Sequence, residues 1–129
     1  MGRQVIVLDT TVLIDQLRGV ASAGTALRRA SQQGHRLQCS VVSRTEVLRG
    51  ARREELPQVG RLFDALEWLP VTSQVADLAG ALGARYRATH GLLDLPDTVV
   101  AATALVAGAD IWTSNVRHFP MFDGLTTPY

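Results

Sequence analysis

Four polar side chains stand where strands are expected to end or helices to begin: Asp9, Glu46, Asp97 and Asn115. Asp9, Glu46 and Asn115 each follow closely on an apolar run, and Asp97 opens an apolar helix. In an open α/β sheet, residues at the carboxyl ends of parallel strands line one crevice. We therefore expect these four side chains to meet there. Because clustered carboxylates repel one another unless a cation neutralises them, the pattern predicts a divalent-metal site.

Local structure offers a second interpretation of two of these acids. Asp9 could cap the following helix, although Thr11 could serve as that cap and leave the Asp9 carboxylate free. Ser43 and Glu46 have the spacing of a capping box, in which the Glu side chain reaches back to the backbone N–H of the Ser. The residues alone therefore leave a structural role and a metal-binding role open for both acids.

Two further segments carry polar groups that could join such a site. Asp94 and Asp97 bracket Pro96 at a helix start, where the helix dipole favours both carboxylates but a single cap needs only one of them. Thr113-Ser114-Asn115 ends a strand, although three short polar side chains are also typical of an ordinary turn. The histidines show no metal-ligand spacing, so each is expected to be a surface or core residue: His35, His90 and His118.

Length and composition indicate a globular protein. The chain has 129 residues, which predicts one domain over residues 1–129 with a substantial hydrophobic core. Hydrophobic residues make up 47% and charged residues 19%, which excludes a disordered chain. The formal net charge is only +1, because 13 basic residues, all of them Arg, face 12 acidic ones. That balance lacks the marked basic excess of a dedicated nucleic-acid binder.

The lone cysteine and the apolar runs indicate where the protein works. Cys39 has no partner for an internal disulfide, and its place in an expected strand predicts a small buried apolar residue. The start of the chain does not resemble a signal peptide. No apolar stretch reaches the roughly 18 residues that span a membrane. We therefore expect a cytoplasmic protein.

The apolar periodicity predicts alternating strands and helices. We expect strands near residues 3–8, 37–42, 68–71 and 111–113, and a short edge strand near 125–127. Helices are expected to begin near Thr11, Ala21, Ser43, Pro57, Ser73 and Pro96. Strands that alternate with helices imply βαβ units. The predicted fold is therefore α/β, with three α/β/α layers and a central parallel sheet.

Four segments, taken in order, resemble the successive motifs of a PIN domain: Asp9–Asp15, Glu46, Pro96–Ala104 and Thr113–Phe119. More narrowly, they are similar to the VapC toxins of bacterial toxin–antitoxin pairs. The resemblance runs from the first expected strand to the last and so covers nearly the whole chain. No single motif carries it, but four in this order and at these separations are specific.

The resemblance assigns metal coordination to Asp9, Glu46 and Asp97. Asn115 stands at the fourth position, where many PIN domains carry Asp, and this departure bears on how many metal ions the site holds tightly. We place all four residues in the catalytic site. The positions expected to support it are Thr11, Thr113 and Asp94.

The resemblance also implies the activity and the partners. It implies a divalent-metal-dependent endoribonuclease toxin, a VapB-like antitoxin that inhibits it, and a homodimer. Carboxylate oxygens suit Mg²⁺ or Mn²⁺, and attack by metal-activated water would leave a 5′-phosphate and a 3′-hydroxyl. The near-neutral charge favours local Arg contacts to a structured RNA such as tRNA. The candidates for those contacts are Arg44, Arg49 and Arg117.

Two other functions fit part of the pattern. A haloacid-dehalogenase-like phosphatase would use Asp9 as a nucleophile, but it needs a second Asp two residues later and a Lys. This chain has Thr11 there and contains no Lys. A catalytically silent PIN-like binding module would have lost the motif carboxylates, and three of the four positions retain them.

Overall fold

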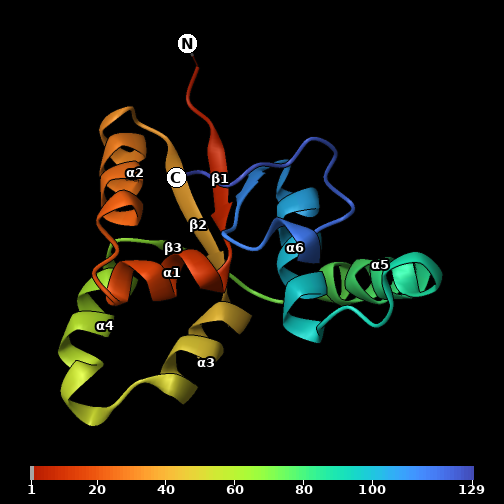
Figure 1. Cartoon of the computed structure of the whole chain (residues 1–129), viewed down its shortest axis with the longest axis horizontal. Coiled ribbons are helices and arrows are strands. Elements are labelled where there is room, and N and C mark those ends of the chain that lie inside the picture. The colour runs from red at the N-terminus through yellow and green to blue at the C-terminus, as the bar shows by residue number, and fades with distance from the viewer. Residues whose placement is uncertain (1) are drawn as a thin grey trace.

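The computed structural model describes residues 2–129, which form a parallel four-stranded sheet with helices on both faces (Figure 1). The strands lie in the order β3-β2-β1-β4, so the most hydrophobic strand, β1, is an interior one. This arrangement confirms the predicted three-layer α/β/α fold. The strands are β1 (Val5–Leu8), β2 (Arg36–Ser40), β3 (Glu67–Leu69) and β4 (Asp110–Trp112).

Helices connect the strands, as a parallel sheet requires. Over the described range, no helix is both long enough and apolar enough to cross a lipid bilayer. The α-helices are α1 (Thr10–Leu17), α2 (Ala21–Gln32), α3 (Val41–Gly50), α4 (Leu56–Asp64), α5 (Ser73–His90) and α6 (Leu95–Ala107). Two short 3₁₀ turns are η1 (Arg53–Glu55) and η2 (Val116–His118).

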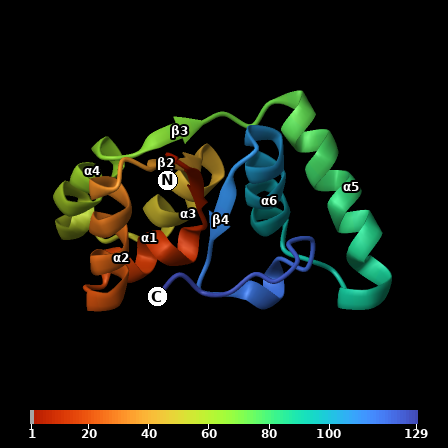
Figure 2. The same ribbon diagram turned by 90° about the horizontal axis from the view of Figure 1, so that it is seen from above.

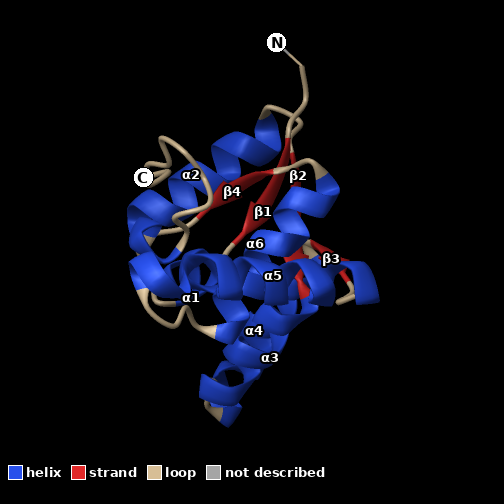
Figure 3. Cartoon of the chain, turned by 90° about the vertical axis from the view of Figure 1, so that its right-hand side faces the viewer, coloured by secondary structure: helices blue, strands red, loops and turns tan. Residues whose placement is uncertain are grey.

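Each face of the sheet has its own hydrophobic core, because successive side chains of a strand point to opposite faces. Ile6, Leu8 and Cys39 pack with residues of α1 to α4, and Val7 packs with residues of α5 and α6. Figures 2 and 3 show the sheet between these two groups of helices. Cys39 is fully buried, as predicted, and burial raises the pKa of its thiol to about 12. Its thiol therefore remains protonated at neutral pH.

The register of β1 determines which polar residues become neighbours. Leu8 lies opposite Trp112 of β4, and the backbone N–H of Asp9 donates to the Trp112 carbonyl at 2.8 Å. The next residue of each strand therefore emerges at the same edge of the sheet, which places Asp9 beside Thr113. β2 runs parallel to β1 and delivers the first turn of α3 to that edge. The strand topology thus creates the crevice in which the candidate residues meet.

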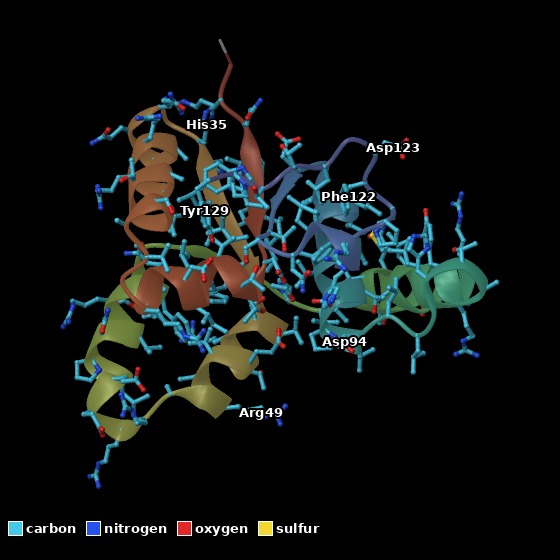
Figure 4. All side chains as sticks on the ribbon, in the orientation of Figure 1. His35, Arg49, Asp94, Phe122, Asp123 and Tyr129 are labelled. Atoms are coloured by element: carbon cyan, nitrogen blue, oxygen red, sulfur yellow. The ribbon has the colours of Figure 1, made fainter. Side chains whose placement is uncertain are left out.

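The structure departs most from the prediction at the start of α3 and in the C-terminal segment. β2 ends at Ser40, because the Ser40 hydroxyl accepts a hydrogen bond from the Val42 N–H at 3.2 Å and starts α3 at the next residue. The edge strand predicted at residues 125–127 is wrong, since this part of the described chain has no strand. The segment instead runs toward α1, where the Tyr129 hydroxyl donates to Asp15 Oδ2 at 2.6 Å (Figure 4).

Candidate active site

Asp9 is held at the carboxyl end of β1 by two threonine hydroxyls. Its side chain is buried, with 2% of the residue exposed. Asp9 Oδ2 accepts a hydrogen bond from Thr11 Oγ1 at 2.8 Å and another from Thr113 Oγ1 at 2.9 Å. The prediction that Thr11 caps α1 is wrong, because Asp9 occupies the cap position and Thr11 lies inside the helix. The Asp9 side chain itself makes no capping bond.

Backbone N–H groups fix the two hydroxyls in turn. The Ser114 N–H donates to Thr11 Oγ1 at 3.1 Å, and the Asn115 N–H donates to Thr113 Oγ1 at 2.9 Å. Each threonine therefore uses its own proton for Asp9, and this orients the carboxylate. Asp9 Oδ1 has no hydrogen bond within residues 2–129. One carboxylate oxygen thus anchors the side chain and the other is free for a ligand.

Asp97 lies in the first turn of α6, where its carboxyl is subject to the negative charge of Asp9. Burial raises the pKa of its carboxyl to about 6, and the charges of Asp9 and Asp94 add to the rise, against the opposing hydrogen bond from His118. Within the described chain, the arginine ion pairs are made with Glu54, Glu55 and Glu67. The remaining ion pair joins His118 to Asp97. No arginine of residues 2–129 therefore neutralises the Asp9–Asp97 pair.

His118 contacts Asp97 in this site, although the spacing of the histidines in the sequence does not indicate it. Its Nδ1 lies 2.8 Å from Asp97 Oδ2. Asp94, Asp97 and His118 each present one ligand atom, and these atoms lie within 4.8 Å of one another. The sequence shows no ligand spacing around His118, and its side chain is 44% exposed, so it lies at the surface as one of the two predicted alternatives. The one available signal was its place just after a strand, three residues beyond Asn115.

Asp94 begins α6 without capping it. It occupies the N-cap position, but its side chain makes no capping hydrogen bond, and the residue is exposed. Its carboxylate is therefore free to interact beside Asp97, at the start of α6 (Figure 4). This geometry agrees with the expectation that the start of α6 does not need the carboxylates of both Asp94 and Asp97 for capping.

Glu46 does not form the predicted capping box. Ser40 caps α3, so Ser43 lies inside the helix and is buried. Glu46 Oε1 instead accepts a hydrogen bond from Thr10 Oγ1 at 2.6 Å, and Thr10 Oγ1 lies 2.8 Å from Ser43 Oγ. The residue that holds Glu46 is thus the neighbour of Asp9 in sequence. Among residues 2–129, Glu46 makes no hydrogen bond to Asp9 or Asp97 and is not in the ligand group of Asp94, Asp97 and His118.

Asn115 contacts both His118 and Thr113. Its side-chain Nδ2 is 3.1 Å from each ring nitrogen of His118, and its backbone N–H bonds Thr113. The fold therefore gathers polar groups from β1, α1, α6 and the turn after β4. The residues joined to one another by hydrogen bonds or by ligand atoms within 4.8 Å are Asp9, Thr11, Asp94, Asp97, Thr113, Asn115 and His118.

The arginines suggested for RNA contacts differ in their surroundings. The Arg44 guanidinium lies 4.6 Å from the centre of the Phe63 ring and 5.0 Å from that of Trp68. This cation–π contact gives Arg44 a structural role between α3, α4 and β3. Arg49 and Arg117 are exposed, and Arg49 projects from α3 into solvent (Figure 4). Arg44 is exposed as well, so all three arginines remain candidates for RNA contacts.

The assembled groups are suited to a divalent cation. Carboxylate oxygens are typical ligands of Mg²⁺ and Mn²⁺, and an imidazole nitrogen binds first-row transition ions. Closely spaced carboxylates with one raised pKa also indicate charge that a cation would relieve. The cluster could therefore hold an ion between α6 and the carboxyl end of β1.

Comparison with known proteins agrees with this geometry. The family model described as "PIN domain" matches residues 6–123. Ribonuclease VapC19 of Mycobacterium tuberculosis is 42% identical over 122 residues, which cover 95% of this chain and 98% of the relative. Ribonuclease VapC10 of the same organism is 41% identical over 124 residues, covering 96% of this chain and 92% of the relative.

A solved structure shares the fold over almost the full length of both chains. It is a chain of the toxin–antitoxin complex from Klebsiella pneumoniae, with a TM-score of 0.77 and 27% identity. The alignment covers 96% of this chain and 98% of the other. The match of the family model, the sequence relatives and the fold all lead to one assignment. The chain belongs to the PIN domain family.

Proposed function

We propose that this protein is a divalent-metal-dependent endoribonuclease and the toxin of a toxin–antitoxin pair. The observation that carries the proposal is the buried Asp9 carboxylate, which two threonine hydroxyls hold by one oxygen, together with the ligand group of Asp94, Asp97 and His118. Relatives that cover nearly the whole chain are named ribonucleases. The matched structure is a toxin–antitoxin complex.

The residues fit a bound Mg²⁺ or Mn²⁺ ion. Asp9 Oδ1 and the Asp97 carboxylate would hold it, with Glu46 and Asn115 at the rim. When bound, such an ion lowers the pKa of a coordinated water and stabilises negative charge on the departing oxygen. The donor set supports this assignment, because oxygen ligands dominate it.

The chain's own groups prepare the site for that chemistry. Thr11 and Thr113 hold Asp9 Oδ2, so the carboxylate keeps one orientation whether or not an ion is present. Thr10 positions the Glu46 carboxylate, which can accept a proton from a water at the rim. Asn115 offers an uncharged amide where a carboxylate would add repulsion. Groups pre-positioned in this way need little reorganisation when the substrate phosphate arrives.

The substrate and partners follow from the relatives. We propose that a structured RNA such as tRNA enters the crevice, with Arg44, Arg49 and Arg117 contacting its phosphates. A VapB-like antitoxin would block the same crevice by placing a cationic side chain against the uncompensated carboxylates. We also propose that the toxin acts as a homodimer in the cytoplasm, where its RNA substrate is found.

The test is cleavage of total RNA by the purified protein with Mg²⁺ or Mn²⁺, each with and without a chelator. We expect cleavage that the chelator abolishes, and products with 5′-phosphate and 3′-hydroxyl ends. Asp9→Asn is the matched inactive control, because it keeps the shape of the side chain. Cleavage that persists in the chelator or in Asp9→Asn would refute the proposed mechanism. Metal binding without any cleavage would instead support a silent PIN-like binding module.

A further inference from the structure

The contact between His118 and Asp97 joins two segments that are distant in sequence. His118 ends η2, and Asp97 lies in the first turn of α6. The side chain of His118 is 44% exposed and that of Asp97 is 15% exposed. The imidazole is therefore more exposed to solvent than the carboxylate that it contacts.

The distances suit two ligands of one ion. Neighbouring ligands that are each about 2.1 Å from an octahedral ion lie about 3 Å apart. His118 Nδ1 and Asp97 Oδ2 are 2.8 Å apart, and an oxygen of Asp94 completes a group within 4.8 Å. A hydrogen bond that only fastened η2 to α6 would not require the second carboxylate of Asp94.

A second feature is the free oxygen of Asp9. Asp9 is 2% exposed, and its Oδ1 has no hydrogen-bond partner in the described part of the chain. Asp9 is not one of the three residues whose ligand atoms lie within 4.8 Å of one another. Hydrogen bonds nevertheless connect Asp9 through Thr113 and Asn115 to His118, so its free oxygen is available to a cation on the same side of the site.

The ligand types differ from an all-carboxylate site. Asn115 contributes an uncharged amide, and its Nδ2 lies 3.1 Å from the His118 ring nitrogens. The chain therefore has one anionic group fewer on this rim and an imidazole next to it. Mg²⁺ prefers oxygen ligands, whereas imidazole favours first-row transition ions.

We propose that His118 is a metal ligand, which together with Asp97 and Asp94 gives this site a preference for a first-row transition ion such as Mn²⁺ over Mg²⁺. The inference rests on the proposed function in one respect, because Asp97 is a metal ligand in both proposals. It goes further by assigning an imidazole nitrogen to the ion and a role in ion selection to His118.

The test is a pair of measurements on the full chain without RNA. Calorimetry gives the affinities for Mn²⁺ and Mg²⁺, and pulsed electron paramagnetic resonance of the Mn²⁺ complex detects coupling to an imidazole nitrogen. We expect that coupling in the wild-type protein and its loss in His118→Gln. We also expect His118→Gln to weaken Mn²⁺ binding at least tenfold and Mg²⁺ binding less than twofold. His90→Gln is the matched control, because His90 is exposed at the end of α5.

Other outcomes separate this inference from the proposed function. Equal losses of Mn²⁺ and Mg²⁺ affinity in His118→Gln, without nitrogen coupling in the wild type, would overturn the inference and make His118 a positioning residue for Asp97. An unchanged Mn²⁺ affinity would overturn it as well, and metal-dependent cleavage would still stand. Failure of the wild-type protein to bind either ion would overturn both. Should His118→Gln not fold, His118→Glu replaces it, with an expected shift of preference toward Mg²⁺.

Discussion

Replacing Asp97 by Asn removes a negative charge that destabilises the metal-free fold. The pKa of this carboxyl rises from the ordinary value of 3.8 to about 6, chiefly because of burial and then because of Asp9. Each pKa unit corresponds to about 1.4 kcal/mol, so the ionised group lowers the free energy of unfolding by roughly 3 kcal/mol. Asn keeps a polar partner for His118 but carries no charge. We expect Asp97→Asn to stabilise the metal-free protein by about 1–3 kcal/mol at pH 8.

The pH dependence follows from the direction of the shift. A carboxyl whose pKa is raised on folding contributes stability that is fully present below its unfolded value, 3.8, and is lost as the pH rises through about 6. The advantage of Asp97→Asn over the wild type should therefore be small near pH 4 and largest at pH 8.

The assay is urea unfolding with a chelator present, at both pH values. Asp123→Asn is the control, because Asp123 is exposed on a loop away from the site (Figure 4). Added Mn²⁺ should stabilise the wild type and should have a smaller effect on Asp97→Asn, since only a state that binds the ion gains from it. A variant that is less stable than the wild type at pH 8, or whose advantage is the same at both pH values, would show that Asp97 is a structural residue and refute this reasoning.

Three further substitutions test the surrounding groups. Thr113→Val removes a hydroxyl from Asp9 Oδ2 and should weaken Mn²⁺ binding by about 10–100-fold in calorimetry; unchanged affinity would mean that Asp9 needs no such support. Glu46→Gln should abolish RNA cleavage and change the free energy of unfolding by less than about 1 kcal/mol, because Gln can still accept the bond from Thr10; near-normal cleavage would remove Glu46 from the site. Asn115→Asp should tighten Mn²⁺ binding and lower the melting temperature in chelator together, and the absence of both changes would place Asn115 outside the site.

The fold could be predicted because its signals are local and strong. The apolar run before Asp9 predicts a buried strand, and Pro96 before a mostly apolar stretch predicts the helix α6, which is buried from Thr98 to Ala104. Once alternating strands and helices imply a parallel sheet, its carboxyl edge becomes the place where Asp9 and the turn after β4 meet. The joint position of Asp9, Asp97 and Thr113 therefore followed from the sequence.

The assignment of the helix cap could not be made locally. Ser40 and Ser43 are both good cap residues, and the choice between them depends on where β2 stops pairing with its neighbours. The structure starts α3 at Ser40, so the apparent capping box of Ser43 and Glu46 is never formed. That shift leaves the Glu46 carboxylate to the hydroxyl of Thr10, from a different segment.

His118 was missed for a different physical reason. Metal-ligand spacing in a sequence detects ligands of one helix or loop, whereas His118 and Asp97 are 21 residues apart and meet only in the folded chain. Their contact depends on η2, a short turn that the periodicity of apolar residues in the sequence does not predict. The interactions that complete the site are therefore tertiary.

The most direct test of the metal centre is the position of Mn²⁺ in crystals of the protein, located by anomalous scattering. We expect a strong peak within about 2.5 Å of carboxylate oxygens of both Asp9 and Asp97. That peak should disappear in crystals of Asp97→Asn grown under the same conditions. A fully occupied Mn²⁺ site elsewhere, with no peak between Asp9 and Asp97, would contradict a metal centre at these two residues.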